Sequence, residues 1–512
     1  MENCRGRIIT AACFSAVTGA VSFIWDRAVF TFPQKQEESY QTALTDYCIC
    51  KILAVIVLFV LFYGLLTLIF SRDEAGCRLI EVLKCGALYL PVMIAALIIK
   101  LPAGFVTNDE YSILNDATHL IHDTWFNIMT VYYYIVSLML IPHRYGPIFM
   151  KVIIEFFVVG VTVHRTKEYF GKRIGMLMYV LFLLYPVIAY TTSAHRLPVY
   201  FLIYLAVFVK LLYDRLEKKS IGFLQTFLIL FAMAVLSQWR TEGIYLFVLA
   251  PLLMFMVYPQ FRNIKNALIL LGVFFALEGL LWIPQNGAVS SNLDGAANDR
   301  MKPFWAYTIT NMYRNGLDKE KNAADLAEVD RYISLEAIEK INEHYGDINY
   351  EDVLILYEPG FAGVREGAGD AEFIGYSEAL KRIFKNNPDV FIKTRWGAFC
   401  YSALPFHITF SDFSAKGLVS FAISIVKTVS YNLFIPVGFA FCACIYSLVR
   451  RKWYSFFVFG GLMSHFFIVF ILAPASYFKY YFPVYILSYF YIIALAVAVI
   501  AGRKEKKAYT VI

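Results

Sequence analysis

The chain has 512 residues, of which 59% are hydrophobic and 17% are charged, and its formal net charge is +7. This composition is far more apolar than that of ordinary soluble domains, which excludes a single soluble globular protein. The lysines and arginines form short clusters between apolar runs and not one basic face, which argues against nucleic acid as a partner. We therefore expect an all-α polytopic membrane protein.

Apolar runs of roughly 20 residues, long enough to cross a bilayer, predict about twelve transmembrane helices. The first run follows Arg5 and Arg7, and no small-residue cleavage site precedes Trp25, so we interpret it as an uncleaved helix and not as a signal peptide. The runs begin near Ile8, Ile52, Val82, Pro147, Ile174, Leu197, Ile221, Gly243, Ala267, Val429, Tyr454 and Tyr480.

Basic clusters assign one orientation to all of these helices, because cytoplasmic loops carry an excess of lysine and arginine. Both termini are then cytoplasmic. The inner clusters are Arg72 with Arg78, Arg165 to Arg173, Arg215 to Lys219, Arg262 with Lys265, Arg450 to Lys452, and Arg503 to Lys507. The outer segments are a stretch from Trp25 to Cys50, a segment after Leu101, and a long one from Pro284 to about Thr428.

This orientation divides the chain into four parts. We expect two helices in residues 1–81, seven helices with an acidic first external loop in 82–283, an α-rich extracytoplasmic domain in 284–428, and three helices with a basic tail in 429–512. The outer domain contains two stretches of helical composition, 325–345 and 377–396.

The segment after Leu101 holds an amphipathic pattern and an ambiguous apolar run. Apolar residues at helical spacing face Ser112, Asp116, His119 and Asp123, which predicts a helix in the membrane interface. Phe126 to Ile141 is apolar enough to span, but a span there would reverse the orientation of the basic clusters, so we place it along or partly into the outer leaflet.

Chemistry is first indicated by the acidic residues of that segment. Asp109 and Glu110 open it, and Asp109, Asp116 and Asp123 recur every seven residues, which aligns them along one face of a continuous helix. A partly desolvated carboxylate at the water boundary can act as a general base toward a hydroxyl. The alternative is a solvated polar face without chemistry.

A second candidate site is the turn SQWRTEGIYLF, from Ser237 to Phe247, on the same outer side. An arginine so close to hydrocarbon requires a partner, and the planar fork of Arg240 suits a phosphate. The alternative is a local ion pair with Glu242 that joins two helices. Further cations at outer helix ends are His195, Arg196 and Lys479, each of which is individually compatible with a lipid headgroup contact.

The remaining features to consider are two carboxylates within apolar helices, the cysteines, and known nucleotide-binding and metalloprotease motifs. Glu155 and Glu278 lie within apolar helices, where a carboxylate joins helices or relays protons. The nine cysteines imply neither a disulfide framework nor a zinc site. The sequence contains no P-loop, Rossmann or HExxH motif.

With DE at Asp109 and Glu110 and WRTEG at the later turn, the chain resembles the GT-C superfamily of polytopic glycosyltransferases, such as protein O-mannosyltransferases, aminoarabinose transferases and family 39-like enzymes. Residues 82–283 would supply the seven-helix module of that superfamily, and the large outer loop after it also fits. The first two helices depart from the family pattern and have no role by analogy.

The resemblance implies transfer of a sugar from a polyprenyl-phosphate donor to a hydroxyl of a glycan, lipid or protein, with inversion. Asp109 would be the base and Glu110 a second acidic residue. Arg240 would bind the donor phosphate with Arg196, His195 or Lys479, supported by Glu242, Asp116 and His119. Trp305, Tyr307 and Tyr313 would cover the acceptor sugar. A divalent metal requirement stays open, and no metal ligand is assigned.

Three other interpretations remain: a transporter or lipid flippase, a glycan polymerase or ligase, and a membrane scaffold. The buried carboxylates favour the transporter, whereas the long outer segment after the ninth helix argues against paired six-helix halves. The absence of an ER retrieval signal favours a bacterial plasma membrane as the location.

Overall fold

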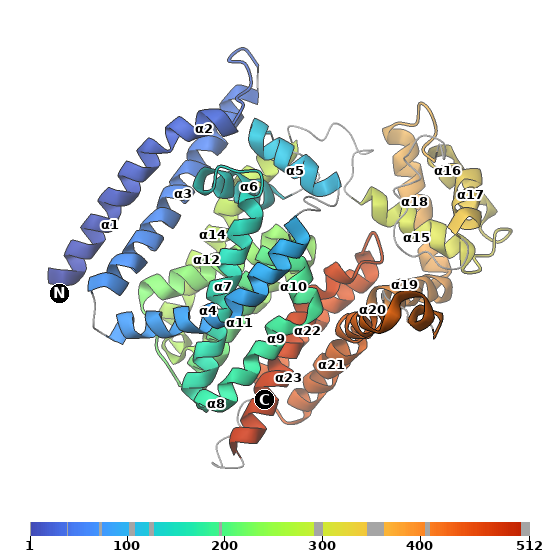
Figure 1. Ribbon diagram of the computed structural model, residues 1–512. Coiled ribbons are helices and arrows are strands. Elements are labelled where there is room, and N and C mark those ends of the chain that lie inside the picture. The colour runs from blue at the N-terminus through green and yellow to red at the C-terminus, as the bar shows by residue number, and fades with distance from the viewer. Residues whose placement is uncertain are drawn as a thin grey trace. The chain divides into compact units, whose positions relative to one another are not determined.

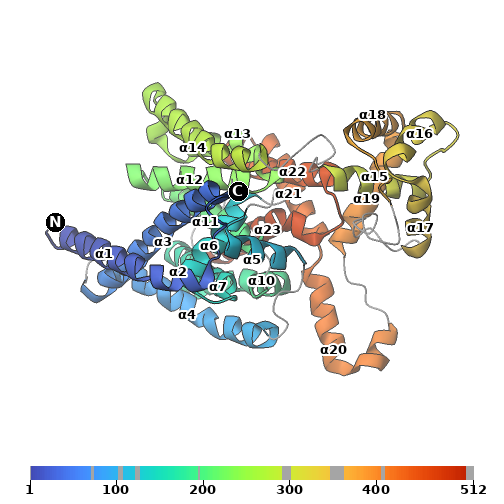
Figure 2. The same cartoon turned by 90° about the horizontal axis from the view of Figure 1, so that it is seen from above.

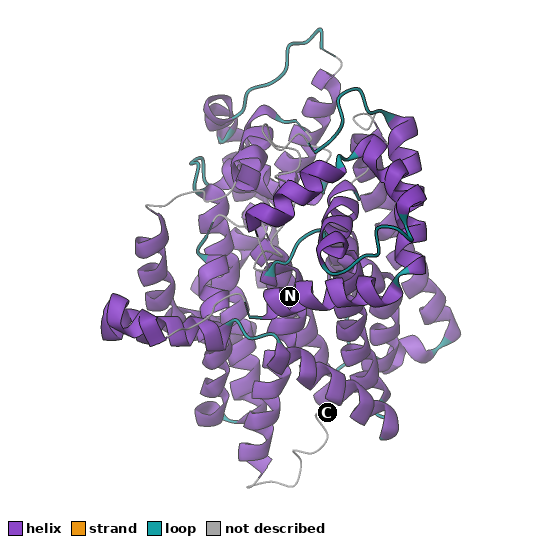
Figure 3. Ribbon diagram, turned by 90° about the vertical axis from the view of Figure 1, so that its right-hand side faces the viewer, coloured by secondary structure: helices purple, strands orange, loops and turns teal. Residues whose placement is uncertain are grey.

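The computed structural model describes residues 2–37, 39–70, 74–101, 108–121, 127–193, 197–290, 301–345, 363–404 and 410–502. Regular structure in these ranges is helical, as Figure 3 shows. An isolated antiparallel bridge joins Ile333 to Val364. The expected all-α class is therefore confirmed for the described chain.

Within these ranges, eight helices are long and apolar enough to cross a membrane, or up to ten if two bent pairs each count as one span. The bent pairs are Arg5–Val21 with Phe23–Val29, at 41°, and Lys172–Leu183 with Tyr185–Thr191, at 63°. The long spans are Ser39–Phe70, Gly76–Ile99, Gly146–Phe170, Leu197–Leu216, Ile264–Gln285, Phe421–Val449, Trp453–Leu472 and Phe478–Gly502. Two predicted spans, which begin near Ile221 and Gly243, coincide with shorter apolar helices, so the count of twelve stays a prediction.

The chain forms two compact units. The first comprises Met1–Gln285, Ala443–Val458 and Ile486–Ile512. Its helices are α1 (Glu2–Val21), α2 (Phe23–Val29), α3 (Ser39–Phe70), α4 (Glu74–Lys100), α5 (Asn108–His119), α6 (Ile128–Leu140), α7 (Gly146–Phe170), α8 (Lys172–Gly175), α9 (Tyr179–Leu183), α10 (Tyr185–Thr191), α11 (Leu197–Leu216), α12 (Phe223–Trp239), α13 (Leu246–Val257) and α14 (Ile264–Ser290), with short 3₁₀ turns η2 (Met176–Met178), η3 (Thr241–Tyr245) and η4 (Pro259–Arg262).

The second unit comprises Asn286–Cys442 and Phe459–Tyr485. It contains α15 (Lys302–Arg314), α16 (Ala323–Tyr332), α17 (Leu335–Tyr345), α18 (Asp370–Asn386), α19 (Pro388–Ala403), α20 (Phe410–Ser430) and η7 (Phe478–Tyr481). The helices α21 (Phe434–Val449), α22 (Trp453–Leu472) and α23 (Phe482–Gly502) each contribute residues to both units.

Small residues allow close contact in the first unit between α4 and α7 (Figure 1). A Cβ at Gly86 would lie 2.8 Å from the carbonyl oxygen of Phe156, and one at Gly160 would lie 2.5 Å from that of Val82. Any larger residue would separate the two helices, so glycine sets their distance, as in many membrane helix pairs. Helix α7 also packs on α11, which places it at the centre of the unit.

The N-terminal helices differ from the prediction in extent. Helix α2 continues to Val29 and α3 begins at Ser39, so the connection between them is shorter than the expected stretch from Trp25 to Cys50. Helix α3 therefore carries Lys51, which donates a hydrogen bond of 2.5 Å to Asp26. Arg78, which we expect in a loop, lies on α4.

Helix α6 occupies most of the segment Phe126 to Ile141, which we expect along or partly into the outer leaflet, and it is enclosed by other helices of the first unit. It packs against α3, α5, α7 and α12 (Figure 2), and none of its residues is exposed. Its thirteen residues are too few to cross a bilayer, since each adds about 1.5 Å. Asn127 begins the helix by accepting a hydrogen bond of 2.9 Å from the amide of Met129.

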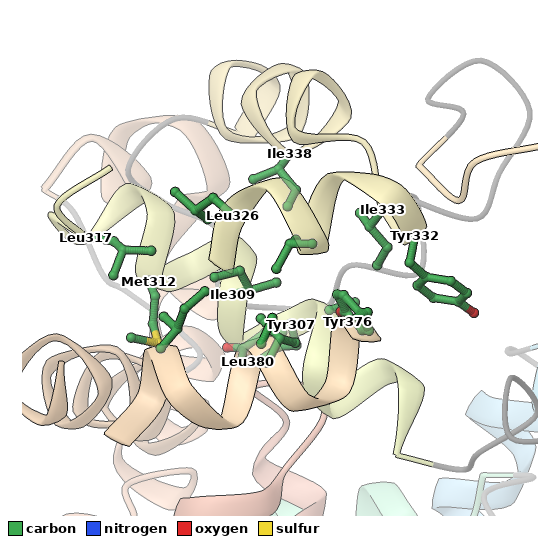
Figure 4. Packing of buried hydrophobic residues seen from close by; sticks show 14 of the residues in the cluster. Tyr307, Ile309, Met312, Leu317, Leu326, Tyr332, Ile333, Ile338, Tyr376 and Leu380 are labelled. Carbon is green, nitrogen blue, oxygen red and sulfur yellow. The ribbon is translucent and has the colours of Figure 1, made fainter. Parts of the chain in front are cut away.

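The core of the second unit is a cluster of buried residues from α15 to α19 (Figure 4). The tyrosine ring of Tyr332 lies 5.0 Å from that of Tyr376 within it. The two predicted helical stretches are each broken: 325–345 at Ile333 and Ser334, and 377–396 before Pro388, whose ring lacks the amide that would continue a helix.

This core uses the aromatic residues that the resemblance would place at a sugar. Tyr307 is fully buried and contacts Ser476. The ring of Trp305 stacks on Phe384 at a centroid distance of 5.8 Å. Tyr307 is thus a core residue, which corrects its assignment to the acceptor site, whereas Trp305 is only partly buried against the core.

Arg395 is 1% exposed and joins α19 to the C-terminal end of α22. Its Nε and Nη2 atoms donate hydrogen bonds of 2.7 Å to the carbonyl oxygens of Phe470 and Ala473. The last carbonyls of a helix lack intrahelical hydrogen-bond donors and carry partial negative charge. A buried guanidinium both donates hydrogen bonds to them and compensates that charge.

Substituting Arg395→Met is expected to lower the free energy of unfolding by about 2–4 kcal/mol, because two buried carbonyl groups lose charged donors. Unfolding by SDS titration in mixed micelles measures the change. Lys393→Met, at an exposed cation of the same helix, should cost under about 0.5 kcal/mol. Equal effects of the two substitutions would contradict the capping role.

Candidate functional site

Helix α5 presents two adjacent carboxylates in different environments. Asp109 and Glu110 lie in its first turn, where negative charge is favoured by the helix dipole. Glu110 is 1% exposed, whereas Asp109 is partly exposed. Asp109 is therefore the carboxylate of this pair that a ligand in solvent can reach.

The two faces of α5 differ less in solvent exposure than the sequence pattern predicts. Ile113 and Ala117 are buried as expected, but Asp116 is also buried, at 8% exposed. The His119 ring nitrogen Nδ1 lies 2.8 Å from the carbonyl oxygen of Asn115. The expected solvated face with Asp116 is thus wrong at that residue, and Asp123 lies outside the described residues.

A buried charge cluster surrounds Glu110. Lys151 and Glu155 lie one turn apart on α7, and each is 1% exposed. The ammonium group of Lys151 is attracted to both Glu110 and Glu155 and donates a hydrogen bond to the carbonyl of Ser193. The cation is thus attracted to carboxylates on two helices, α5 and α7.

Helix α4 closes the cluster on a further side. The hydroxyl of Tyr89 donates a hydrogen bond of 2.6 Å to the carbonyl of Phe182 and lies 3.5 Å from Glu155 Oε1. Sequence reasoning noted Glu155 but missed Lys151. The available signal was KVIIE, in which a cation and a carboxylate four residues apart share one face of an apolar helix.

The second site is the turn between α12 and α13. Arg240 ends α12 in an extended conformation, and its Nε donates a hydrogen bond of 2.6 Å to Glu242 Oε1, which its Nη2 also contacts. The local ion pair that the sequence left as an alternative is therefore present. Gly243 completes the turn, since a Cβ there would lie 2.3 Å from the carbonyl oxygen of Leu236.

Arg240 lines a groove of about 450 Å³ between α12, η3, α13 and α14. The polar end contains Ser237, Gln238, Arg240, Thr241 and Glu278, and the apolar part contains Ile244, Phe247, Phe275, Gly279 and Trp282. The apolar side chains other than glycine are exposed on helices of membrane composition, so the groove opens toward lipid. Its form suits an amphiphile.

Glu278 is held in place at the polar end. Its Oε1 accepts a hydrogen bond of 2.5 Å from the Ser237 hydroxyl, and its Oε2 accepts one of 2.6 Å from the Gln238 amide. These bonds explain how a carboxylate is tolerated within α14. Glu278 thus joins α14 to α12 by hydrogen bonds, which is one of the two roles that the sequence analysis considered, the other being a proton relay.

Helix α6 connects the groove to α5. The Asn127 side-chain amide donates a hydrogen bond of 2.8 Å to the Gln238 carbonyl, and the Trp239 indole donates one of 2.9 Å to Thr130. Helix α5 packs on α6 as well. The acidic helix and the polar end of the groove therefore share one support.

The other predicted cations lie in the second unit or outside the described residues. Lys479 lies in η7 of the second unit, with its Nζ 4.5 Å from the ring centroid of Tyr477. His195 and Arg196 lie outside the described residues. Within the part of the chain that was described, no group of three or more His, Cys, Asp or Glu side chains is arranged to hold a metal ion.

Comparison with protein-family models, with curated proteins and with solved structures gives no match to this chain.

Substituting Lys151→Met should lower the free energy of unfolding by about 3–5 kcal/mol, because it leaves two buried carboxylates without their cation. Unfolding in mixed micelles measures this. Adding Glu155→Gln should recover part of the loss, and Lys172→Met, at an exposed site, should have little effect. A loss that Glu155→Gln does not reduce would contradict the electrostatic coupling.

Proposed function

We propose that the chain is a membrane glycosyltransferase of the GT-C type. It transfers a sugar from a polyprenyl-phosphate donor to a hydroxyl acceptor on the outer face of a bacterial plasma membrane. The observation that carries the proposal is the common support of two sites by α6: the accessible carboxylate of Asp109 on α5 and the lipid-facing groove with Arg240 at its polar end. Twelve spans with cytoplasmic termini and an outer domain at 284–428 belong to the same proposal.

Asp109 is the general base. It removes the proton of the acceptor hydroxyl as that oxygen attacks the anomeric carbon, which inverts the configuration and releases the lipid phosphate. Glu110 is less suited to this role, since it is enclosed beside Lys151 and an acceptor cannot reach it. The different burial of the two neighbours supports a division between one reacting and one anchoring carboxylate.

The groove accommodates the donor. Its apolar part takes the first isoprene units, which pack against the lipid-facing rings of Phe247, Phe275 and Trp282 in place of lipid chains. The phosphate then lies at the polar end, where the Arg240 guanidinium stabilises the negative charge that grows on the leaving oxygen. Lys479, His195 and Arg196 are further candidate cations for that phosphate.

Asp109→Asn should reduce transfer by at least about 100-fold while expression and folding are kept, because the amide cannot accept the proton. The assay follows a panel of radiolabelled undecaprenyl-phosphate hexoses in proteoliposomes that contain membrane extract as acceptor. Ser112→Ala, at another residue of α5, is the matched control and should stay within about twofold of wild type. Equal activity of Asp109→Asn and wild type would refute the assignment of the base.

Gly279→Leu should raise the KM for the donor about tenfold with little change in kcat, since it fills the groove where a ligand binds equally in ground and transition states. A Cβ at Gly279, which lines the groove, meets no atom within 4 Å, so the backbone there has open space for a side chain. Gly272→Leu is the control, because it lies on the same helix with equal space outside the groove. The same KM for both variants would exclude the groove as the donor site.

A transporter is the second candidate, favoured by the buried Lys151 and Glu155 within α7. The two functions differ in which residue matters. Transport coupled to protons would be lost in Glu155→Gln and kept in Asp109→Asn, whereas sugar transfer requires Asp109. Uptake of protons into liposomes, measured beside sugar transfer on the same variants, distinguishes them.

A further inference from the structure

Tyr200 carries a buried hydroxyl that the described structure leaves without a hydrogen bond. The residue lies in the first turn of α11 and is 0% exposed. Its hydroxyl has no hydrogen-bond partner in the described chain. A buried polar group in this condition costs stability, because the group has lost water and gained nothing in return.

The hydroxyl lies directly beside the turn that carries Arg240 and Glu242. A Cβ built on Gly243 would be 3.1 Å from the Tyr200 hydroxyl oxygen, so the hydroxyl reaches the residue that follows Glu242. Both Glu242 and Arg240 interact electrostatically with Tyr200. The ring itself is fixed, since it stacks on Tyr204 and meets Trp239 edge-on.

A ligand phosphate bound at Arg240 would change the hydrogen-bond partner of Glu242. Without a ligand, Glu242 neutralises a guanidinium at the edge of hydrocarbon, where an unpaired charge is expensive. A phosphate at the same guanidinium repels the carboxylate and competes for the same N–H donors. The displaced carboxylate then needs another donor nearby, because its surroundings are largely apolar.

We propose that Tyr200 is this donor: when a lipid phosphate binds Arg240 in the groove, Glu242 leaves the guanidinium and accepts a hydrogen bond from the Tyr200 hydroxyl. The inference rests on the proposed donor site and adds a positioning residue to it. Tyr200 acts through Glu242 and does not touch the ligand. The unsatisfied hydroxyl of the ligand-free protein is then the counterpart of a bond made in the ligand-bound one.

The test measures binding of undecaprenyl phosphate and of undecaprenol, which lacks the phosphate, to the full detergent-solubilised chain through the shift in unfolding temperature. Tyr200→Phe should weaken binding of the phosphate lipid about three- to tenfold, the effect of one hydrogen bond, and leave undecaprenol unchanged. In a Glu242→Ala background the same substitution should have no effect, because no carboxylate remains to receive the bond.

Stability provides a second readout with a matched control. Ligand-free Tyr200→Phe should unfold at or above the wild-type temperature, since it removes an unbonded hydroxyl. Tyr204→Phe, one turn along α11, should unfold lower, because the Tyr204 hydroxyl accepts a hydrogen bond of 2.8 Å from Tyr245. Tyr204→Phe should not change the preference of the protein for undecaprenyl phosphate over undecaprenol.

Each contrary result has a distinct meaning. A wild-type protein that does not prefer the phosphate lipid overturns the donor site and this inference together. A wild-type preference that Tyr200→Phe leaves unchanged, or weakens equally with and without Glu242, overturns the role of Tyr200 alone. Destabilisation by Tyr200→Phe as large as that by Tyr204→Phe overturns it as well.

Discussion

Charged groups in the apolar interior have to be paired within the protein, and this requirement determines how the helices of the first unit are arranged. The attraction of Lys151 to carboxylates of α5 and α7 is the central case. A lysine that is 1% exposed is largely removed from solvent, so the cation is stabilised by its attraction to Glu110 and Glu155 and by its bond to the Ser193 carbonyl. The position of α5 on the bundle is thereby restricted.

The same rule explains why α6 is short and enclosed. Its ends and side chains bond to the neighbouring helices, through Asn127 and Thr130 on one side and Tyr132 on another, where the Tyr132 hydroxyl donates a bond of 2.6 Å to Asp46. A helix bonded from several directions has little freedom to move. Groups on the elements around it are therefore held at fixed positions, which a reacting carboxylate and a phosphate site both need.

The sequence predicted the position of nearly every long helix, because the length and composition of an apolar run are local properties. It could not predict what depends on a partner far along the chain. The role of Lys151 is recognised only from its attraction to Glu110 in the folded chain. The role of Tyr200 is recognised only from the closeness of its hydroxyl to Gly243. Asp116 fitted a polar helix face, yet packing covers that face. At Arg240 the spacing allowed a phosphate or an ion pair, and the structure shows the pair without excluding a change of partner.

The first two helices gain a role that the family resemblance does not give them. Adjacent residues on a helix point about 100° apart, so Glu110 can anchor α5 inward while Asp109 faces outward, provided that the helix cannot rotate. Lys151 fixes one end of α5. The other end is fixed by the amide of Thr31, which donates a hydrogen bond of 2.8 Å to the carbonyl of Thr118. Because the N-terminal hairpin also holds α6 through Asp46, residues 1–81 brace both helices that carry or support the candidate site.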